Sequence, residues 1–238
     1  MPIVRVIGPG RAGTAMSRAL AAAGWTITPP IRHGDDVSNA ASGVDLVVVA
    51  TPDVNVASIA AAIDPVDETV VAHLAGSLGL DALEPHTRRA SIHPLVSIPS
   101  GDTDVRGAWF AVSGDPLASR VVADLDGRVV AVEDAHRAEY HAAACIASNH
   151  VVALLGQVER VAHAAGVPLD AFLDLTRQTL DNIERVGPRA ALTGPVARGD
   201  EATVARHRAA LDPSELPAYD AMADQARRLA DRVEVGRS

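Results

Sequence analysis

Short apolar runs alternate with alanine-rich segments along the first half of the chain. The runs, many of them rich in β-branched residues, cover 3–8, 25–31, 45–51, 69–75, 89–94, 108–114 and 128–133. Helices are expected at about 11–23, ending before Gly24, and near 54–63. Strands that alternate with helices are typical of a doubly wound parallel sheet. Residues 1–133 therefore predict a Rossmann-like α/β domain.

The strand pattern disappears after about Asp134. Alanine-rich helical patterns then predict an all-helical second domain over residues 134–238, with no flexible linker before it. The expected helices cover about 134–165, 169–186, 201–211 and 214–233, and the breaker-rich loop "LTGPVARGD" lies at 192–200.

The second predicted strand, "WTITPPI", is followed by an unusually short connection. Only the twelve residues 33–44 join it to the next strand, "DLVVVAT". A parallel crossover needs about a dozen residues by itself, so this segment leaves no room for a helix and a further strand. The third strand of the usual fold should be missing, and the second strand should form the sheet edge. Pro29 and Pro30 agree with an edge position.

The charge and the cysteine content exclude several classes of protein and of chemistry. The chain has a net charge of −9, and all 21 basic residues are arginine, which makes a nucleic-acid binder unlikely and rules out lysine chemistry. Cys145 is the only cysteine, so an internal disulfide and a cysteine metal cluster are excluded. The first residues form a strand pattern without a signal region, and the apolar runs are short for a membrane span. A cytoplasmic protein without a membrane partner is expected.

A glycine-rich motif, "GPGRAG", lies between the first strand and the first helix. Gly8, Gly10 and Gly13 have the G-x-G-x-x-G spacing in the strand–turn–helix context that this motif requires. Gly8 permits the turn, Gly10 lets a pyrophosphate approach, and Gly13 lets helix and strand pack closely. The helix N-terminus offers N–H groups to the phosphates. The alternative is a turn that needs glycines for packing alone.

The end of the second strand carries an arginine where NAD-binding proteins place an acid. About 20 residues beyond the glycine loop the chain reaches His33, and Arg32 precedes it. An arginine there can pair with a 2′-phosphate, which favours NADP. The alternative is an ordinary surface arginine. Asp35 and Asp36 are expected to begin the connecting segment rather than to bind ribose.

Polar residues also follow the later strands, where open α/β sheets bind ligands. Thr51 and Pro52 follow one strand, Ser77 the next, and His93 the one after that. His93 is a candidate proton or hydrogen-bond donor to a substrate oxygen, or else a structural histidine. Ser77 is a candidate contact to the nicotinamide or substrate, or else a helix N-cap.

The helical half contributes a second group of candidates. His141, Cys145, Ser148 and Asn149 share one helix face, which suggests a lined cleft or, alternatively, a buried polar contact that fixes helix packing. In the loop at 192–200, Thr193 and Arg198 are candidate substrate contacts, with Arg198 placed to clamp a carboxylate. A salt bridge from Arg198 to Asp200 or Glu201 is the alternative. The scattered histidines give no metal-ligand spacing.

Several motifs together resemble a known family. "VIGPGRAGTAM", "DLVVVATPD", "HLAGS", "IHP", "YHAAACIASNHVVALL", "TLDNI" and "ALTGPVARGD" are similar to Rossmann-like oxidoreductases whose C-terminal half is the domain of unknown function 2520. That family resembles the wider group of 6-phosphogluconate dehydrogenase, pyrroline-5-carboxylate reductase and ketopantoate reductase. The resemblance covers essentially the whole chain.

The resemblance implies NADP-linked reduction, with NAD possible, of a small 2-oxo acid such as ketopantoate or a related C=N carboxylate. It also implies a homodimer formed through the helical domain. The candidate cofactor contacts are Gly8, Gly10, Arg11, Ala12, Gly13, Arg32, Thr51, Pro52 and Ser77. The candidate catalytic residues are His93, His141, Ser148 and Asn149, and no metal is expected.

Two departures from the group matter for the mechanism. Ketopantoate and 6-phosphogluconate enzymes use a catalytic lysine on the corresponding helix, and this chain has no lysine. The connection at 33–44 also lacks residues that usually surround the adenine side. A non-catalytic nucleotide- or metabolite-binding protein derived from such a reductase is therefore the alternative hypothesis.

Overall fold

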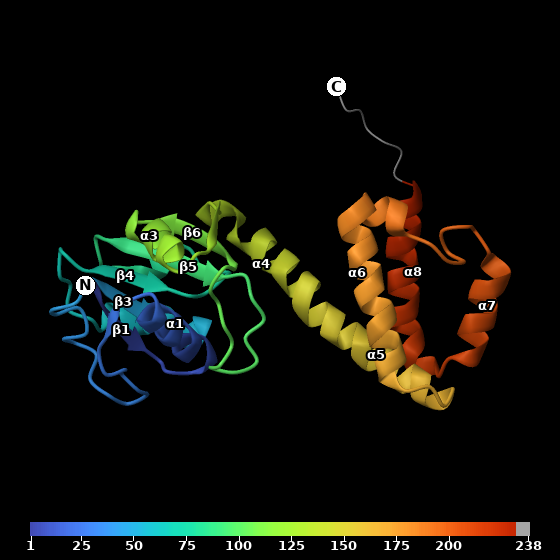
Figure 1. Cartoon of the computed structure of the whole chain (residues 1–238), viewed down its shortest axis with the longest axis horizontal. Helices are drawn as coiled ribbons and strands as arrows, with labels where there is room; N and C mark the ends of the chain where they lie inside the picture. The colour runs from blue at the N-terminus through green and yellow to red at the C-terminus, as the bar shows by residue number, and fades with distance from the viewer. Residues whose placement is uncertain (232–238) are drawn as a thin grey trace, which may run out of the picture. The chain divides into compact units, whose positions relative to one another are not determined.

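The computed structural model describes residues 1–231 and divides the chain into two compact units (Figure 1). The first unit is Met1–Ser148, and the second begins at Asn149. The last strand ends at Ala131 and helices follow from Asp134. The change from strands to helices therefore lies next to the expected domain boundary after residue 133. The two compact units, however, divide between Ser148 and Asn149, inside a helical run. The domain boundary itself stays a prediction.

A seven-stranded sheet forms the centre of the first unit. The strands are β1 (Ile3–Ile7), β2 (Thr26–Ile27), β3 (Leu46–Val49), β4 (Val70–His73), β5 (Arg89–Pro94), β6 (Trp109–Gly114) and β7 (Arg128–Ala131). Their order is β2-β1-β3-β4-β5-β6-β7, and every neighbouring pair is parallel except β5 and β6. The Rossmann-like fold class predicted from the sequence is confirmed.

Alternate strand residues enter two separate cores, one on each face of the sheet. Val4 and Val48 lie in one core with α1 (Arg11–Ala22) and α3 (Leu117–Asp124). Ile7 and Val47 lie in the other core, which contains α2 (Asp53–Ala61). A sheet that is covered on both faces buries the side chains of each face, and this explains why the strands are almost entirely apolar.

The second strand is the sheet edge, as the short connection predicted. β2 pairs only with β1, and β1 pairs directly with β3 on its other side. The connection at 33–44 contains turns and no helix, yet it buries Val37 and Ala40 in the second core. Arg5 fixes this connection, because its guanidinium donates to the carbonyl oxygens of Asn39 and Ala40 at 2.9 and 2.8 Å.

The far side of the sheet differs from the all-parallel expectation. β5 and β6 are antiparallel, and the fourteen-residue segment 95–108 between them contains no helix. An antiparallel neighbour needs no crossover helix, so this connection can be a loop. The helix α3, which the sequence reading did not identify, supplies the crossover between β6 and β7.

A continuous helical run covers Asp134–Ala164. It comprises η2 (Asp134–His136), α4 (Arg137–Cys145), the π-helical turn η3 (Ile146–His150) and α5 (Val151–Ala164). By length and composition alone this run is long and apolar enough to cross a membrane, unlike the short apolar runs read from the sequence. A single such helix is weak evidence of a membrane protein, and the cytoplasmic location stays a prediction.

Helices α5, α6 (Leu169–Ala191), α7 (Glu201–Ala210) and α8 (Leu216–Asp231) form the second unit, with η4 (Pro213–Glu215) before α8. Helix α6 was expected to end near residue 186, and it is interrupted there by Gly187 at φ 80°. The expected end of the last helix, at 232–233, lies outside the described residues.

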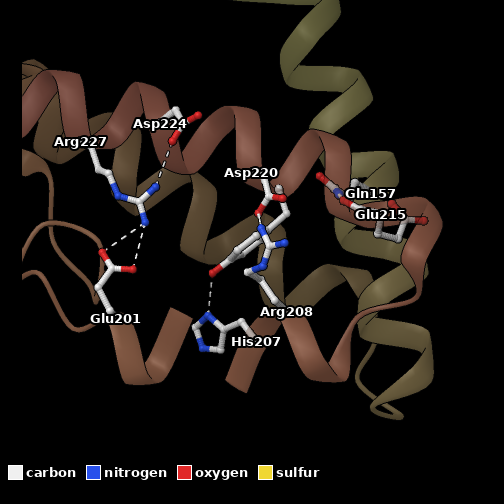
Figure 2. Close-up of polar contacts among 9 residues, drawn as sticks. Gln157, Glu201, His207, Arg208, Glu215, Asp220, Asp224 and Arg227 are labelled. Atoms are coloured by element: carbon white, nitrogen blue, oxygen red, sulfur yellow. Dashed lines mark hydrogen bonds and ion pairs between the residues drawn. The ribbon is translucent and has the colours of Figure 1, made fainter. Parts of the chain in front are cut away.

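Polar contacts join the elements of the second unit (Figure 2). Arg227 of α8 bonds Glu201 at the start of α7, and the hydroxyl of Tyr219 lies 2.9 Å from Nδ1 of His207. Arg160 of α5 bonds the Glu215 carboxylate at 2.6 Å. These links lie mostly at exposed positions, where each ion pair contributes little stability.

Candidate functional site

The glycine loop sits at the carboxyl end of β1, directly before α1. Gly8 has φ +87°, and a Cβ there would lie 3.0 Å from the carbonyl oxygen of Ala50. A Cβ on Gly13 would lie 2.3 Å from the carbonyl oxygen of Gly8. The fold therefore requires glycine at both positions, for a turn and for close helix–strand packing.

Gly10 is different, because neither its backbone nor its packing requires glycine. Its φ is −75°, and nothing lies within 4 Å of the position that its Cβ would take. Gly10 is also the N-cap of α1, and no side chain caps this helix. The open space thus lies beside unsatisfied backbone N–H groups, which is the arrangement that lets a phosphate approach a helix N-terminus.

A cavity of about 660 Å³ opens in front of this loop. Gly8, Pro9 and Gly10 line one side, residues 32–35 line another, and Thr51 and Pro52 contribute from the end of β3. The volume is in the range of small-molecule and cofactor sites. The residues present therefore fit a nucleotide cofactor in shape and in their phosphate-binding groups.

The structure places Arg32 on the wall of this cavity with an exposed side chain. Its backbone N–H donates to the Asp35 carboxylate at 2.7 Å, while its guanidinium has no hydrogen-bond partner among residues 1–231. Asp36 accepts hydrogen bonds from the backbone N–H and the hydroxyl of Ser38, which lower the pKa of its carboxyl. Both aspartates thus organise the connection at 33–44, as expected.

Ser77 lies after β4, and its hydroxyl donates to the Asp53 carboxylate at 2.8 Å. The short helix that follows begins at Leu80 with Gly79 as its N-cap, so Ser77 is not the cap that the sequence reading offered as an alternative. Asp53 opens α2, where a negative charge is favourable. The side-chain oxygen of Thr51, nearby in sequence, is buried without a partner in the part of the chain that the structure describes.

A second polar group surrounds His93 at the end of β5. The Nδ1 atom of His93 lies 2.7 Å from the Tyr140 hydroxyl of α4, and the His141 ring packs edge-on at 6.1 Å between centroids. The Cys145 sulfur lies 3.9 Å from Nε2 of His141. The structure therefore brings together His93 and His141, two of the predicted catalytic residues, and adds Tyr140 to them.

Gly76 makes this approach possible. A Cβ at position 76 would lie 2.6 Å from Cδ2 of His141 and 2.9 Å from Nε2 of His93. Both imidazoles therefore pack directly on the backbone that follows β4. The pKa of His93 falls to about 4, first because of burial and then because of the neighbouring His141 and Arg137. His93 is consequently neutral at pH 7.

A buried polar row lies on the same face of the sheet. His73, Ser91 and Ser113 are in register across β4, β5 and β6, and Arg137 of α4 donates to the Ser113 hydroxyl at 2.9 Å. Arg137 is 1% exposed, and its Nε and Nη1 atoms have no hydrogen-bond partner among the described residues. No sequence pattern indicated a role for Arg137, because one arginine at the start of an expected helix is usually a solvated charge.

Ser148 and Asn149, the other two predicted catalytic residues, lie within the π-helical turn Ile146–His150. Ser148 is half-buried like His141 and Cys145, whereas Asn149 is exposed. A π-turn adds a residue to the helical repeat, so side chains within and after it no longer follow the 3.6-residue spacing. This explains why Asn149 differs in exposure from the residues expected on its face.

Thr193 and Arg198 lie in the loop between α6 and α7 of the second unit. Arg198 forms no ion pair within residues 1–231, and Asp200 instead caps α7 by accepting from the N–H of Thr203 at 3.0 Å. The alternative of a loop-locking salt bridge from Arg198 is therefore not seen in this part of the chain. No group of three or more potential metal ligands occurs among the described residues either.

Comparison with known proteins adds a domain assignment. Residues 110–226 match the model of the domain of unknown function DUF2520. The matched segment covers the end of the sheet in the first unit and most of the second unit. No curated protein matches the sequence.

Solved structures of similar fold cover nearly the whole chain. A Bacteroides fragilis protein provisionally named an NADP oxidoreductase matches 95% of this chain and 98% of its own, with a TM-score of 0.78 and 19% identity. A reductive aminase from Aspergillus terreus, in complex with NADPH and ethyl levulinate, matches 96% and 94% at TM-score 0.68 and 16% identity.

A pyrroline carboxylate reductase from Plasmodium falciparum with NADP bound matches 97% of this chain and 98% of its own at TM-score 0.63 and 10% identity. At these identities the likenesses show the fold. They do not show a 6-phosphogluconate dehydrogenase or ketopantoate reductase relationship in particular.

Proposed function

We propose that this protein is an NADP(H)-dependent reductase of a small carboxylate that bears a C=O or C=N group. The observation that carries the proposal is Gly10, a glycine that the fold itself does not require, beside an uncapped helix N-terminus and a cavity of about 660 Å³. The fold neighbours named as NADP-linked oxidoreductases support the same reaction class.

Some of the proposed cofactor contacts line that cavity, namely Gly8, Gly10, Arg32, Thr51 and Pro52. The backbone at Gly8, Gly10, Arg11, Ala12 and Gly13 would hold the phosphates. Arg32, whose guanidinium has no partner among residues 1–231, would pair with a 2′-phosphate and so favour NADP over NAD. Thr51, Pro52 and Ser77, at the ends of the next strands, would contact the remainder of the cofactor. When bound, NADPH supplies the hydride.

Histidine would take the role that lysine plays in related enzymes. His93 and His141 are proposed to polarise or protonate the substrate oxygen or nitrogen, because they meet at the carboxyl end of the sheet. Ser148 and Asn149 would orient the substrate, and Thr193 and Arg198 stay candidates for binding its carboxylate. Ketopantoate-like 2-oxo acids and cyclic imino acids are the substrates to test first.

A homodimer formed through the helical unit is part of the proposal. Among the described residues, helix α6 has none that is buried, and it exposes Leu175, Leu180 and Ile183. A second copy of the chain would cover these apolar side chains, since most soluble oligomers are symmetric homo-oligomers.

Turnover assays test the proposed reaction. The full chain would be incubated with NADPH or NADH and a panel of 2-oxo acids and imines, and absorbance at ~340 nm would be followed. We expect consumption of NADPH with at least one carboxylate substrate, and a loss of at least about 100-fold in His141→Ala. Cofactor binding without turnover across the panel would instead support the non-catalytic binding protein. No binding of either cofactor at millimolar concentration would overturn the proposed reductase.

A further inference from the structure

Tyr140 is a polar residue of the His93 group that the sequence did not single out. It lies one position before His141 on α4, and its hydroxyl is 2.7 Å from Nδ1 of His93. The two rings meet edge-on at 88°, with 5.5 Å between their centroids. Among residues 1–231, His93 is the only hydrogen-bond partner of this hydroxyl.

The direction of this hydrogen bond follows from the chemistry of the two groups. A neutral imidazole has one protonated nitrogen and one nitrogen that accepts. A phenol is a stronger acid than neutral imidazole, and it needs an acceptor for its single O–H. Burial raises the pKa of Tyr140 and lowers that of His93, so both groups are neutral at pH 7. The favoured arrangement is therefore Tyr140 O–H donating to Nδ1 of His93.

This arrangement decides which nitrogen of His93 carries the proton. With Nδ1 as the acceptor, the proton lies on Nε2, on the side of the ring that faces Gly76. A Cβ on Gly76 would come within 2.9 Å of that Nε2 atom. Nε2 itself has no hydrogen-bond partner among the described residues, so its N–H is free to meet another group.

We propose that Tyr140 is a positioning residue that holds His93 as the Nε2–H tautomer, with the N–H presented to the substrate's oxygen or nitrogen beside Gly76. The role toward substrate rests on the proposed reductase function, whereas the tautomer does not. Tyr140 acts through His93, and it is not itself placed on the reacting atoms. In an enzyme without lysine, a tyrosine beside a buried histidine would thus fix which nitrogen of that histidine carries the proton.

The second unit supplies a matched control. Nδ1 of His207 lies 2.9 Å from the hydroxyl of Tyr219, and the two rings are 6.0 Å apart at 84° (Figure 2). The two pairs thus have nearly the same geometry, but His207 is exposed. Tyr219→Phe removes the same hydroxyl as Tyr140→Phe from a histidine that has no proposed role.

Nitrogen NMR on the full-length protein tests the tautomer without any substrate. Protein labelled with 15N-histidine would be measured at pH 7, with His93 assigned by its absence in His93→Gln. We expect wild-type His93 to show a protonated Nε2 and an unprotonated Nδ1. Tyr140→Phe should convert it to a mixture of tautomers, whereas Tyr219→Phe should change only the signals of His207. A proton on Nδ1 in the wild type would overturn the proposal, even if Tyr140→Phe failed to fold.

Kinetics test the role toward substrate. With NADPH and a substrate that is turned over, Tyr140→Phe should lower kcat about tenfold while the Kd of NADPH stays unchanged. In a His93→Gln background the same replacement should have no further effect on kcat. An additional loss in that background would show that Tyr140 acts independently of His93. If no substrate is reduced, the proposed function fails, and the spectra alone still decide the tautomer.

Discussion

The two compact units differ sharply in what they bury. The first unit contains two apolar cores, one on each face of its sheet, with side chains such as Phe110 and Leu46 fully buried. The described part of the second unit buries only three apolar residues, Ala162, Val204 and Ala223. The first unit therefore carries its own stability. The second consists of amphipathic helices joined by exposed polar contacts, and it leaves apolar side chains such as Leu175 and Leu180 exposed.

The largest expected effect is on the core of the first unit, and the chain's two phenylalanines make a matched pair for it. Phe110 is fully buried in the core that contains residues of α1 and α3, so Phe110→Ala should lower the free energy of unfolding by about 3–5 kcal/mol. Phe172 on α6 is half-buried, and its replacement should cost about 1 kcal/mol. Urea unfolding followed by circular dichroism measures both. Equal losses would contradict the difference between the units.

Acid should destabilise the first unit through His93. Its folded pKa of about 4 lies below the unfolded value of about 6.5, so only the unfolded chain takes up the proton between these pH values. Its contribution is fully present above pH ~6.5 and is lost as pH falls toward ~4, by up to about 3 kcal/mol. Burial also lowers the pKa of His73, as it does for His93.

Urea unfolding at several pH values between ~6.5 and ~4 measures this slope. His93→Gln should flatten it, whereas His207→Gln, which replaces an exposed histidine of the second unit, should keep the wild-type slope. A wild-type slope in His93→Gln would show that His93 is not neutral in the folded protein.

A charge on the exposed face of α6 should break the proposed dimer. Leu180 is 55% exposed within the chain, and Leu180→Glu would place a carboxylate in the surface that a second copy would bury. We expect the dimer Kd to rise about 100-fold, or about 2.7 kcal/mol. Light scattering over a concentration series measures the mass. Leu95→Glu, at a 42% exposed residue of the first unit, should leave it unchanged. A wild-type chain that is monomeric at all concentrations would refute the dimer.

The smallest expected effect concerns cofactor choice. Arg32→Ala should weaken NADPH binding about tenfold, or about 1.4 kcal/mol, and should leave NADH binding nearly unchanged, because only NADPH carries the 2′-phosphate. The control is Arg18→Ala, which removes an exposed arginine of α1 that pairs with Asp102. Equal losses for both cofactors would mean that Arg32 does not recognise the 2′-phosphate.

The sequence predicted the strand–helix alternation and the missing strand well. β-branched runs separated by helical patterns marked the strands, and the twelve residues at 33–44 left no room for another crossover. Pro29 and Pro30 also indicated an edge, although β2 covers only Thr26–Ile27 of the expected strand 25–31 and both prolines lie after it. These features depend on local composition and on chain length, which a sequence shows directly.

Other features depend on tertiary contacts that no local pattern encodes. The antiparallel pairing of β5 with β6 depends on the direction in which each strand runs. An apolar run has the same pattern in either direction, so the sequence does not show it. Tyr140 and Arg137 contact His93 and Ser113 only through the packing of α4 on the sheet, which their local sequence does not encode. The π-turn at Ile146–His150 likewise altered the face on which Asn149 was expected.

Binding of a nicotinamide dinucleotide by the loop around Gly10 can be measured in a single titration. NADPH would be titrated into the wild type and into Gly10→Glu, at a position where an added Cβ would meet nothing within 4 Å. We expect micromolar binding by the wild type, a loss of at least about 100-fold in Gly10→Glu from charge and bulk at the phosphates, and the same Tm for both. Equal affinity in the two proteins, or no binding by the wild type at millimolar NADPH, would show that this loop does not hold the phosphates of the cofactor.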